Sequence, residues 1–127
     1  MKVALFGGTG FVGSYIVDQL IDSGHKPRLL VREGSDKKVQ SPDSCEIFYG
    51  DISDDESIKK VIDSSDAVIY SIGLIREFKS KGITFENTQF EGVVKCIEAA
   101  LELNVKKFIL MSANGVCPDG TNYFKTK

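Results

Sequence analysis

The chain has 127 residues, of which 42% are hydrophobic and 27% are charged, as is usual for a single globular domain with its own core. Its formal net charge of −2 argues against a surface built to bind nucleic acid or an anionic membrane. No apolar run approaches the ~20 residues that a membrane-spanning helix needs. No signal peptide is found ahead of the first predicted strand. The composition therefore predicts a globular domain with no membrane span.

Three cysteines, Cys45, Cys96 and Cys117, lie far apart in the sequence. None belongs to a C-x-x-C pair, so their spacing suggests neither a disulfide framework nor a zinc site. Isolated thiols in odd number are typical of a cytoplasmic protein, because that compartment keeps them reduced. We therefore expect a cytoplasmic protein without a metal site.

A glycine-rich stretch follows the first predicted strand, residues 3–6. Gly7, Gly10 and Gly13 are each separated by two residues, and an amphipathic segment follows them directly. A strand, a glycine turn and a helix in this order are typical of a dinucleotide-binding turn. The first glycine allows the sharp bend, the second lets a pyrophosphate approach the main chain, and the third lets the helix pack on the strand. The N–H groups at the start of that helix would then face the phosphates.

Further apolar runs predict strands at residues 28–31, 45–49, 67–70 and 107–112. The helix after the glycine turn ends at Gly24. Its apolar positions at helical spacing are Val12, Tyr15, Ile16 and Leu20. Residues 74–82 are predicted to form an exposed loop of mixed charge.

Two more helices are predicted between the later strands. Ser53 with Glu56 has the form of a capping box, so the first of them should begin there. The acidic residues beside it are interpreted as complements to the positive end of that helix rather than as metal ligands. The longest helix covers residues 84–103. Its predicted apolar stripe consists of Phe90, Val93, Val94, Ile97 and Leu101.

Short apolar strands that alternate with helices predict a parallel sheet with helices on both faces, a doubly wound α/β fold of the Rossmann type. Right-handed crossovers give the strand order 3-2-1-4-5. A ligand in such a sheet binds at the carboxyl ends of the strands, near the switch between strands one and four. The residues predicted at these ends are the glycine turn, Arg32, Asp51, Ser71 to Gly73, and Ser112.

The chain resembles the short-chain dehydrogenase/reductase superfamily in its extended or atypical branch. Four features carry the resemblance: the run Gly7-Gly8-Thr9-Gly10-Phe11-Val12-Gly13, Gly50-Asp51, Ser112, and Tyr123 four residues before Lys127. The likeness covers essentially the whole chain. It is nearest to NAD-dependent epimerases/dehydratases, NmrA-like proteins and the NAD(P)H-binding subunit associated with respiratory complex I.

The resemblance implies a nicotinamide dinucleotide, NADP or NAD, as the cofactor. Asp51 and Ile52 would then lie beside the adenine. The pyrophosphate would lie against Gly7, Thr9, Gly10, Phe11, Val12 and Gly13. The ribose on the nicotinamide side would lie against Ser71, Ile72 and Gly73.

Arg32 lies where relatives that prefer NAD carry an acidic residue. An arginine there suits the 2′-phosphate of NADP(H), which it can bind through charge-assisted hydrogen bonds. The neighbouring Glu33, and the alternative that Arg32 is an ordinary solvated loop charge, leave NAD open. On the strength of Arg32 we nevertheless expect NADP(H) to be favoured over NAD(H).

The resemblance also assigns catalytic roles. Tyr123 would exchange a proton with the substrate, Lys127 would lower the tyrosine pKa from about 10 and hold the ribose, and Ser112 would polarise the substrate oxygen. The family places a serine or threonine where this chain has Ala113, and a helix asparagine where it has Gln89.

Two functions are therefore open at the level of sequence. The first is an oxidoreductase, or a nucleotide-sugar epimerase/dehydratase, that acts on an unknown small molecule. The second is a regulatory or assembly protein that binds NAD(P)H without turnover, which the Ala113 context favours. Relatives continue beyond the position of Lys127, so we expect residues 1–127 to be the NAD(P)-binding part of a longer protein. The long helix pairs in the dimers of some relatives, and its charged outer face leaves a homodimer open.

Overall fold

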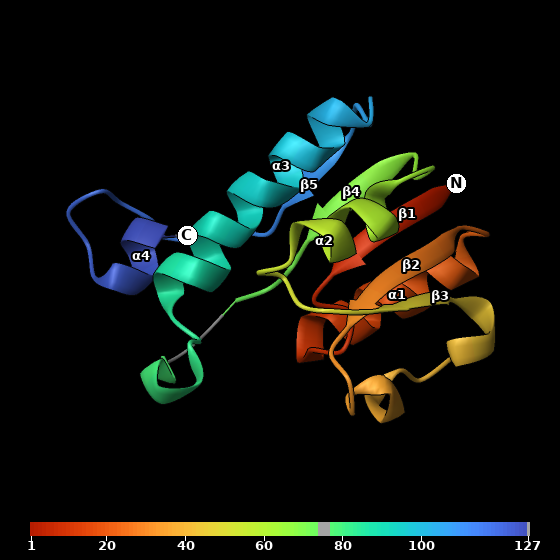
Figure 1. The fold of residues 1–127 in the computed structure, drawn as a ribbon, viewed down its shortest axis with the longest axis horizontal. Coiled ribbons are helices and arrows are strands. Elements are labelled where there is room, and N and C mark those ends of the chain that lie inside the picture. The colour runs from red at the N-terminus through yellow and green to blue at the C-terminus, as the bar shows by residue number, and fades with distance from the viewer. Residues whose placement is uncertain (74–76, 127) are drawn as a thin grey trace.

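A parallel sheet forms the centre of the fold (Figure 1). The structure is a computed structural model that describes residues 1–73 and 77–126. Within these residues five strands lie in the order β3-β2-β1-β4-β5, and all neighbours are parallel. The strands are β1 (Lys2–Phe6), β2 (Lys26–Val31), β3 (Glu46–Tyr49), β4 (Ala67–Tyr70) and β5 (Phe108–Leu110). The predicted fold class and strand order are confirmed.

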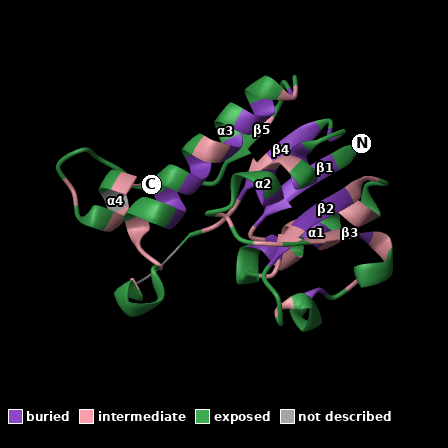
Figure 2. Cartoon of the chain, viewed as in Figure 1, coloured by how far each residue is buried: buried purple, intermediate pink, exposed green. Residues whose placement is uncertain are grey.

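Helices cover both faces of the sheet (Figures 1 and 2). On one face lie α2 (Asp55–Ile62) and α3 (Gly92–Glu102), and on the other lies α1 (Phe11–Asp22). A further short helix, α4 (Asn122–Thr126), packs on the segment before α3. Successive side chains of β1 point to opposite faces of the sheet. Ala4 and Phe6 pack with α2 and α3, whereas Leu5 packs with Val17 of α1. The sheet is therefore buried on both sides, which explains the continuous apolar runs of its central strands.

Shorter helical segments lie in the connections between these elements. Three of them are η1 (Asp36–Lys38), η2 (Pro42–Ser44) and η3 (Lys79–Lys81). A fourth, η4 (Glu86–Glu91), is π-helical and runs directly into α3. The long predicted helix therefore has an irregular first half. Of the predicted loop at residues 74–82, residues 74–76 lie outside the described residues, and Phe78 pairs with Ile83 in an antiparallel bridge.

The predicted apolar stripes of α1 and α3 are only partly buried: Val93 is buried and Ile16 packs against the core, but other members of the stripes are exposed. Tyr15 is 64% exposed and Leu101 is 73% exposed. The residues that these helices turn to the core are smaller: Gly13 and Val17 on α1, and Gly92, Val93, Cys96, Ala99 and Ala100 on α3. Small side chains let a helix lie close to the sheet, so the larger apolar residues face away from it.

The start of α2 also differs from the prediction. Asp54, not Ser53, is the N-cap residue, and its carboxylate accepts hydrogen bonds from the Glu56 N–H (3.3 Å) and the Ser57 hydroxyl (2.6 Å). The Ser57 hydrogen bond, more than any other cause, lowers the pKa of Asp54. Ser53 instead donates its N–H and its hydroxyl to Asp51. The predicted capping box is not formed, because the Ser53 hydroxyl donates to the Asp51 carboxylate and Asp54 holds the N-cap position.

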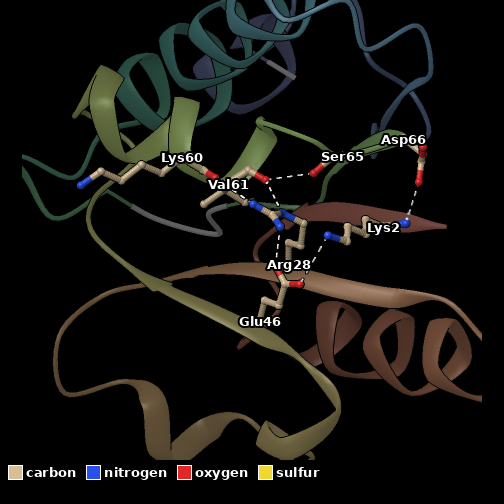
Figure 3. A network of polar contacts seen from close by, with 7 residues as sticks. All are labelled: Lys2, Arg28, Glu46, Lys60, Val61, Ser65 and Asp66. Atoms are coloured by element: carbon tan, nitrogen blue, oxygen red, sulfur yellow. Dashed lines mark hydrogen bonds and ion pairs between the residues drawn. The ribbon is translucent and has the colours of Figure 1, made fainter.

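A buried arginine ties β2 and β3 to the last turn of α2 (Figure 3). Arg28 donates hydrogen bonds to the carbonyl oxygens of Val61 (3.0 Å) and Lys60 (3.1 Å). It also pairs with the Glu46 carboxylate, and its guanidinium lies 4.7 Å from the centre of the Phe48 ring. The C-terminal carbonyls of α2 thus receive donors from the neighbouring strand.

Candidate functional site

The glycine turn between β1 and α1 closes on itself. Gly7 has a φ of +98°, a left-handed conformation that favours glycine, and its carbonyl oxygen accepts a hydrogen bond from the Gly10 N–H (3.1 Å). A Cβ on Gly13 would stand 1.9 Å from the same oxygen. The turn therefore has no room for a side chain on Gly13, and helix α1 lies directly against it.

The same turn touches the end of β4. A Cβ on Gly7 would lie 2.9 Å from the carbonyl carbon of Ser71 and 3.0 Å from the Ile72 nitrogen. The Ser71 N–H donates to the Phe6 carbonyl oxygen (2.8 Å), which carries the pairing of β1 and β4 to the edge of the sheet. Two strand ends predicted from separate parts of the sequence therefore meet at the switch point of the fold.

Two features of this edge fit a phosphate-bearing ligand. Gly10 is the N-cap of α1 and offers no side-chain cap, and the first turn of α1 carries no acidic residue, so its N–H groups point outward without a competing anion. The Ser71 hydroxyl oxygen is buried and has no hydrogen-bond partner within the part of the chain that the structure describes. A dinucleotide would satisfy the helix N–H groups with its pyrophosphate and could supply a partner to this hydroxyl.

The other predicted cofactor residues surround the turn to different degrees. Phe11 and Val12 are exposed at the first turn of α1, while Thr9 and Ile72 are half-buried and Gly73 is exposed. Arg32 is exposed directly after β2, and its carbonyl oxygen accepts a hydrogen bond from the Ser35 N–H (2.9 Å).

Asp51 and Ile52 follow β3 and face different surroundings. Asp51 is exposed, and one oxygen of its carboxylate is engaged by Ser53. Ile52 is half-buried and packs against the core, so close to α3 that a Cβ on Gly92 would lie 3.0 Å from its Cγ1. Ile52 therefore joins the edge of the sheet to α3.

The predicted catalytic residues lie on the segments that follow β5. Ser112 is exposed two residues beyond the end of that strand. Tyr123 is half-buried on α4, with its ring edge-on to Phe85 at 5.9 Å between centroids. Lys127 lies outside the described residues. The proton-transfer pair predicted from the spacing of Tyr123 and Lys127 therefore stays a prediction.

Sequence reasoning missed how Tyr123 is held. The Gln89 side chain is 3% exposed and its Nε2 donates to the Tyr123 carbonyl oxygen (3.3 Å) and to the Thr126 hydroxyl (3.0 Å). No local pattern in the sequence signals this contact, because Gln89 and Thr126 are 37 residues apart.

Comparisons with known proteins agree with this geometry. A family model described as NAD(P)H-binding matches residues 7–126. An isoflavone reductase homolog of Nicotiana glauca is 32% identical over 117 residues, which cover 85% of this chain and 34% of that protein. A photosystem II assembly factor of Trieres chinensis is 31% identical over 116 residues, 91% of this chain and 35% of its own length. The chain thus spans about a third of the length of these relatives.

A solved structure shares the fold over the whole chain. It is a protein of Bacillus halodurans described as an NAD-dependent epimerase/dehydratase, 26% identical, with a TM-score of 0.83. The match covers 100% of this chain and 61% of that one. Among the described residues, no helix is both long and apolar enough to cross a membrane.

Proposed function

The chain belongs to the NAD(P)H-binding family, and from this premise we propose that it serves an oxidoreductase, or a nucleotide-sugar epimerase/dehydratase, of the short-chain dehydrogenase/reductase type. The observation that carries the proposal is the closed glycine turn at the switch between β1 and β4, beside the buried Ser71 hydroxyl. A nicotinamide bound there would accept or supply a hydride.

The residues around the turn would divide the dinucleotide between them. The pyrophosphate would bind at Gly7, Thr9, Gly10, Phe11, Val12 and Gly13. Asp51 and Ile52 would lie beside the adenine. Ser71, Ile72 and Gly73 would lie beside the ribose of the nicotinamide.

We favour NADP(H) because of Arg32. Its side chain is exposed at the carboxyl end of β2, next to the strand that carries the glycine turn. A guanidinium there can bind the 2′-phosphate of NADP(H) through paired hydrogen bonds. NAD(H) has no phosphate at this position.

For catalysis we assign the proton transfer to Tyr123. Lys127 would assist that transfer with its positive charge and hold the ribose, and Ser112 would donate to the substrate oxygen. The substrate is a small molecule with a carbonyl or hydroxyl group at the reacting carbon. The three cysteines are free thiols, which supports the cytoplasm as the compartment.

A second function is kept because one relative, at 31% identity, is an assembly factor. In that case the domain would bind NAD(P)H and report its presence without turnover. The residue after Ser112 is Ala113, where the family has a serine or threonine. The chain therefore lacks the family's hydroxyl group at this position, which supports the alternative without turnover.

Calorimetric titration of the full-length protein with NADPH, and separately with NADH, tests the cofactor. We expect NADPH to bind more tightly and Arg32→Ala to remove the difference, while Lys106→Ala, an exposed lysine next to β5, leaves it unchanged. A preference for NADH would contradict the role of Arg32, and no binding of either would contradict the site.

Tyr123→Phe separates the two functions. If Tyr123 transfers the proton, the variant binds the dinucleotide normally but loses reductase turnover by orders of magnitude. Unchanged function in the cell, with cofactor binding intact, would favour the assembly or regulatory role.

A further inference from the structure

The helix that precedes α3 is interrupted where it meets the end of β4. The Gly92 N–H donates to the carbonyl oxygen of Asn87, five residues back, instead of to Thr88, four residues back. The Thr88 carbonyl oxygen instead accepts a hydrogen bond from the Tyr70 hydroxyl (2.5 Å). The Tyr70 hydroxyl thus donates to a carbonyl oxygen that a regular α-helix would pair with its own N–H group, and a side chain inserted in this way interrupts the regular helix.

Gly92 makes room for this contact. A Cβ at Gly92 would lie 2.4 Å from the Tyr70 hydroxyl oxygen. Tyr70 is 1% exposed and its ring stacks on Phe6, with centroids 6.0 Å apart, so the phenol is fixed by the sheet. The tyrosine and the glycine therefore form a matched pair across the interface between β4 and α3.

The bulge changes where the preceding side chains point. One extra residue in a helical turn rotates everything before it by about 100° relative to α3. In the bulged register, Gln89 is buried and reaches Thr126 and the Tyr123 carbonyl on α4. Phe85, at the start of the same segment, meets the Tyr123 ring. The segment η4 is thus the surface on which α4 rests (Figure 1).

Helix α4 depends on such a support. It has five described residues, and a helix of that length is not stable without packing, because nucleation is unfavourable. We propose that Gln89 is the positioning residue for Tyr123, and that Tyr70 and Gly92 set the register that aims it. This inference rests on the proposed function, in which Tyr123 transfers a proton to or from the substrate.

Hydrogen exchange of the full-length protein, measured by mass spectrometry on peptides that cover residues 121–126, tests the support. Loss of one or two hydrogen bonds in Gln89→Leu should speed exchange there roughly fivefold to tenfold. Thr126→Val, which removes the partner hydroxyl, and Tyr70→Phe, which removes the wedge, should act in the same direction. Gln40→Leu and Tyr49→Phe, two exposed matched controls, should change nothing.

Unchanged exchange of residues 121–126 in all three variants would overturn the proposal, provided that exchange in peptides from α2 shows the rest of the fold to be unchanged.

A double-mutant cycle with Gly92→Ala adds a test of the register. We expect Gly92→Ala to speed exchange of residues 121–126 in the wild-type background and to do so less in the Tyr70→Phe background, because the clashing oxygen is gone. Equal effects in both backgrounds would contradict the tyrosine–glycine pair.

Turnover separates this inference from the proposed function. With NADPH and 9,10-phenanthrenequinone as a carbonyl probe, Gln89→Leu should lower kcat and change its pH profile, while NADPH binding stays intact. If Tyr123→Phe abolishes turnover but Gln89→Leu leaves kcat and its pH profile unchanged, the positioning role fails. If Tyr123→Phe has no effect, the proposed function fails, whatever the exchange rates show.

Discussion

The carbonyl oxygen of Gly7 lies 1.9 Å from the point where a Cβ on Gly13 would stand. Gly13→Ala therefore cannot be accommodated without moving the backbone of the turn or of α1. We expect this variant to lose about 3 kcal/mol of unfolding free energy, measured by urea denaturation, and to lose dinucleotide binding with it. A variant as stable as the wild type would show that the turn can open.

Gly10→Ala separates the fold from the ligand. Gly10 has a φ of −80°, and a Cβ there would lie an ordinary 3.4 Å from the Gly7 oxygen. We expect the unfolding free energy to change by less than about 0.5 kcal/mol. Calorimetry should show at least about a tenfold loss of NADPH affinity, because the added methyl group stands at the approach of the pyrophosphate. Unchanged affinity would place the ligand elsewhere.

Ser71→Ala tests whether the buried hydroxyl serves the cofactor. Its oxygen has no partner within residues 1–73 and 77–126, so replacing it with a methyl group should raise the unfolding free energy of the free protein by about 1 kcal/mol. The affinity for NADPH should fall roughly fivefold to tenfold if the hydroxyl bonds to the bound cofactor. Lower stability together with unaltered affinity would contradict both statements.

Arg28→Met tests the link between β2 and α2. The variant keeps a similar aliphatic stem but removes the arginine donors from two carbonyl oxygens of α2 and from the Glu46 carboxylate. Among the described residues, the side-chain partners that remain to these groups are the Ser65 hydroxyl, on the Val61 carbonyl oxygen, and Lys2, on Glu46. We expect a loss of about 3 kcal/mol in thermal or urea unfolding. Lys2→Met is the control: Lys2 also pairs with Glu46, at 4.0 Å, but is half exposed, so its loss should change the unfolding free energy by less than about 1 kcal/mol.

Stability should decrease in alkaline solution because of Cys96. Burial raises the pKa of this thiol above its ordinary 9.0, so the folded state keeps the proton after the unfolded state has lost it. The contribution of the protonated Cys96 thiol to the unfolding free energy is fully present below pH 9. Above pH 9 this contribution declines by up to about 1.4 kcal/mol per pH unit. Burial also raises the pKa of Cys45 above 9.0 and that of Tyr70 above 10.0, so a Cys96 variant is needed to assign the part of the pH dependence that belongs to Cys96.

Cys96→Ala supplies the comparison for this pH dependence. The cavity should lower the unfolding free energy of the variant by about 1–2 kcal/mol at pH 7. Between pH 9 and 10, urea unfolding of the variant should depend less on pH than unfolding of the wild type. Equal slopes would assign the alkaline loss to other groups.

The features predicted correctly from the sequence depend on short-range patterns. The run of glycines after the first strand, the apolar strands and their alternation with helices define a parallel sheet whose order follows from right-handed crossovers. These patterns involve neighbouring residues and chain topology, so they can be recognised without knowledge of long-range contacts. They also placed the glycine turn and Ser71 at the same edge of the sheet.

Two of the features that were missed depend on contacts between distant residues, and one depends on competition between neighbouring side chains. The sequence alone determined that the chain is a doubly wound dinucleotide-binding domain, because strand periodicity and glycine spacing are local. The tertiary structure decided which helix faces are buried, that Asp54 rather than Ser53 caps α2, and that Tyr70 shifts the register of η4 toward α4. The buried faces and the register were decided by partners that lie close only once the chain has folded: the sheet against which Ala99 packs, and the space that Gly92 leaves for a phenol 22 residues earlier in the chain. The cap of α2 was decided by a local contact, because Asp51 accepts the hydrogen bonds of Ser53 two residues later and Asp54 accepts those of Glu56 and Ser57.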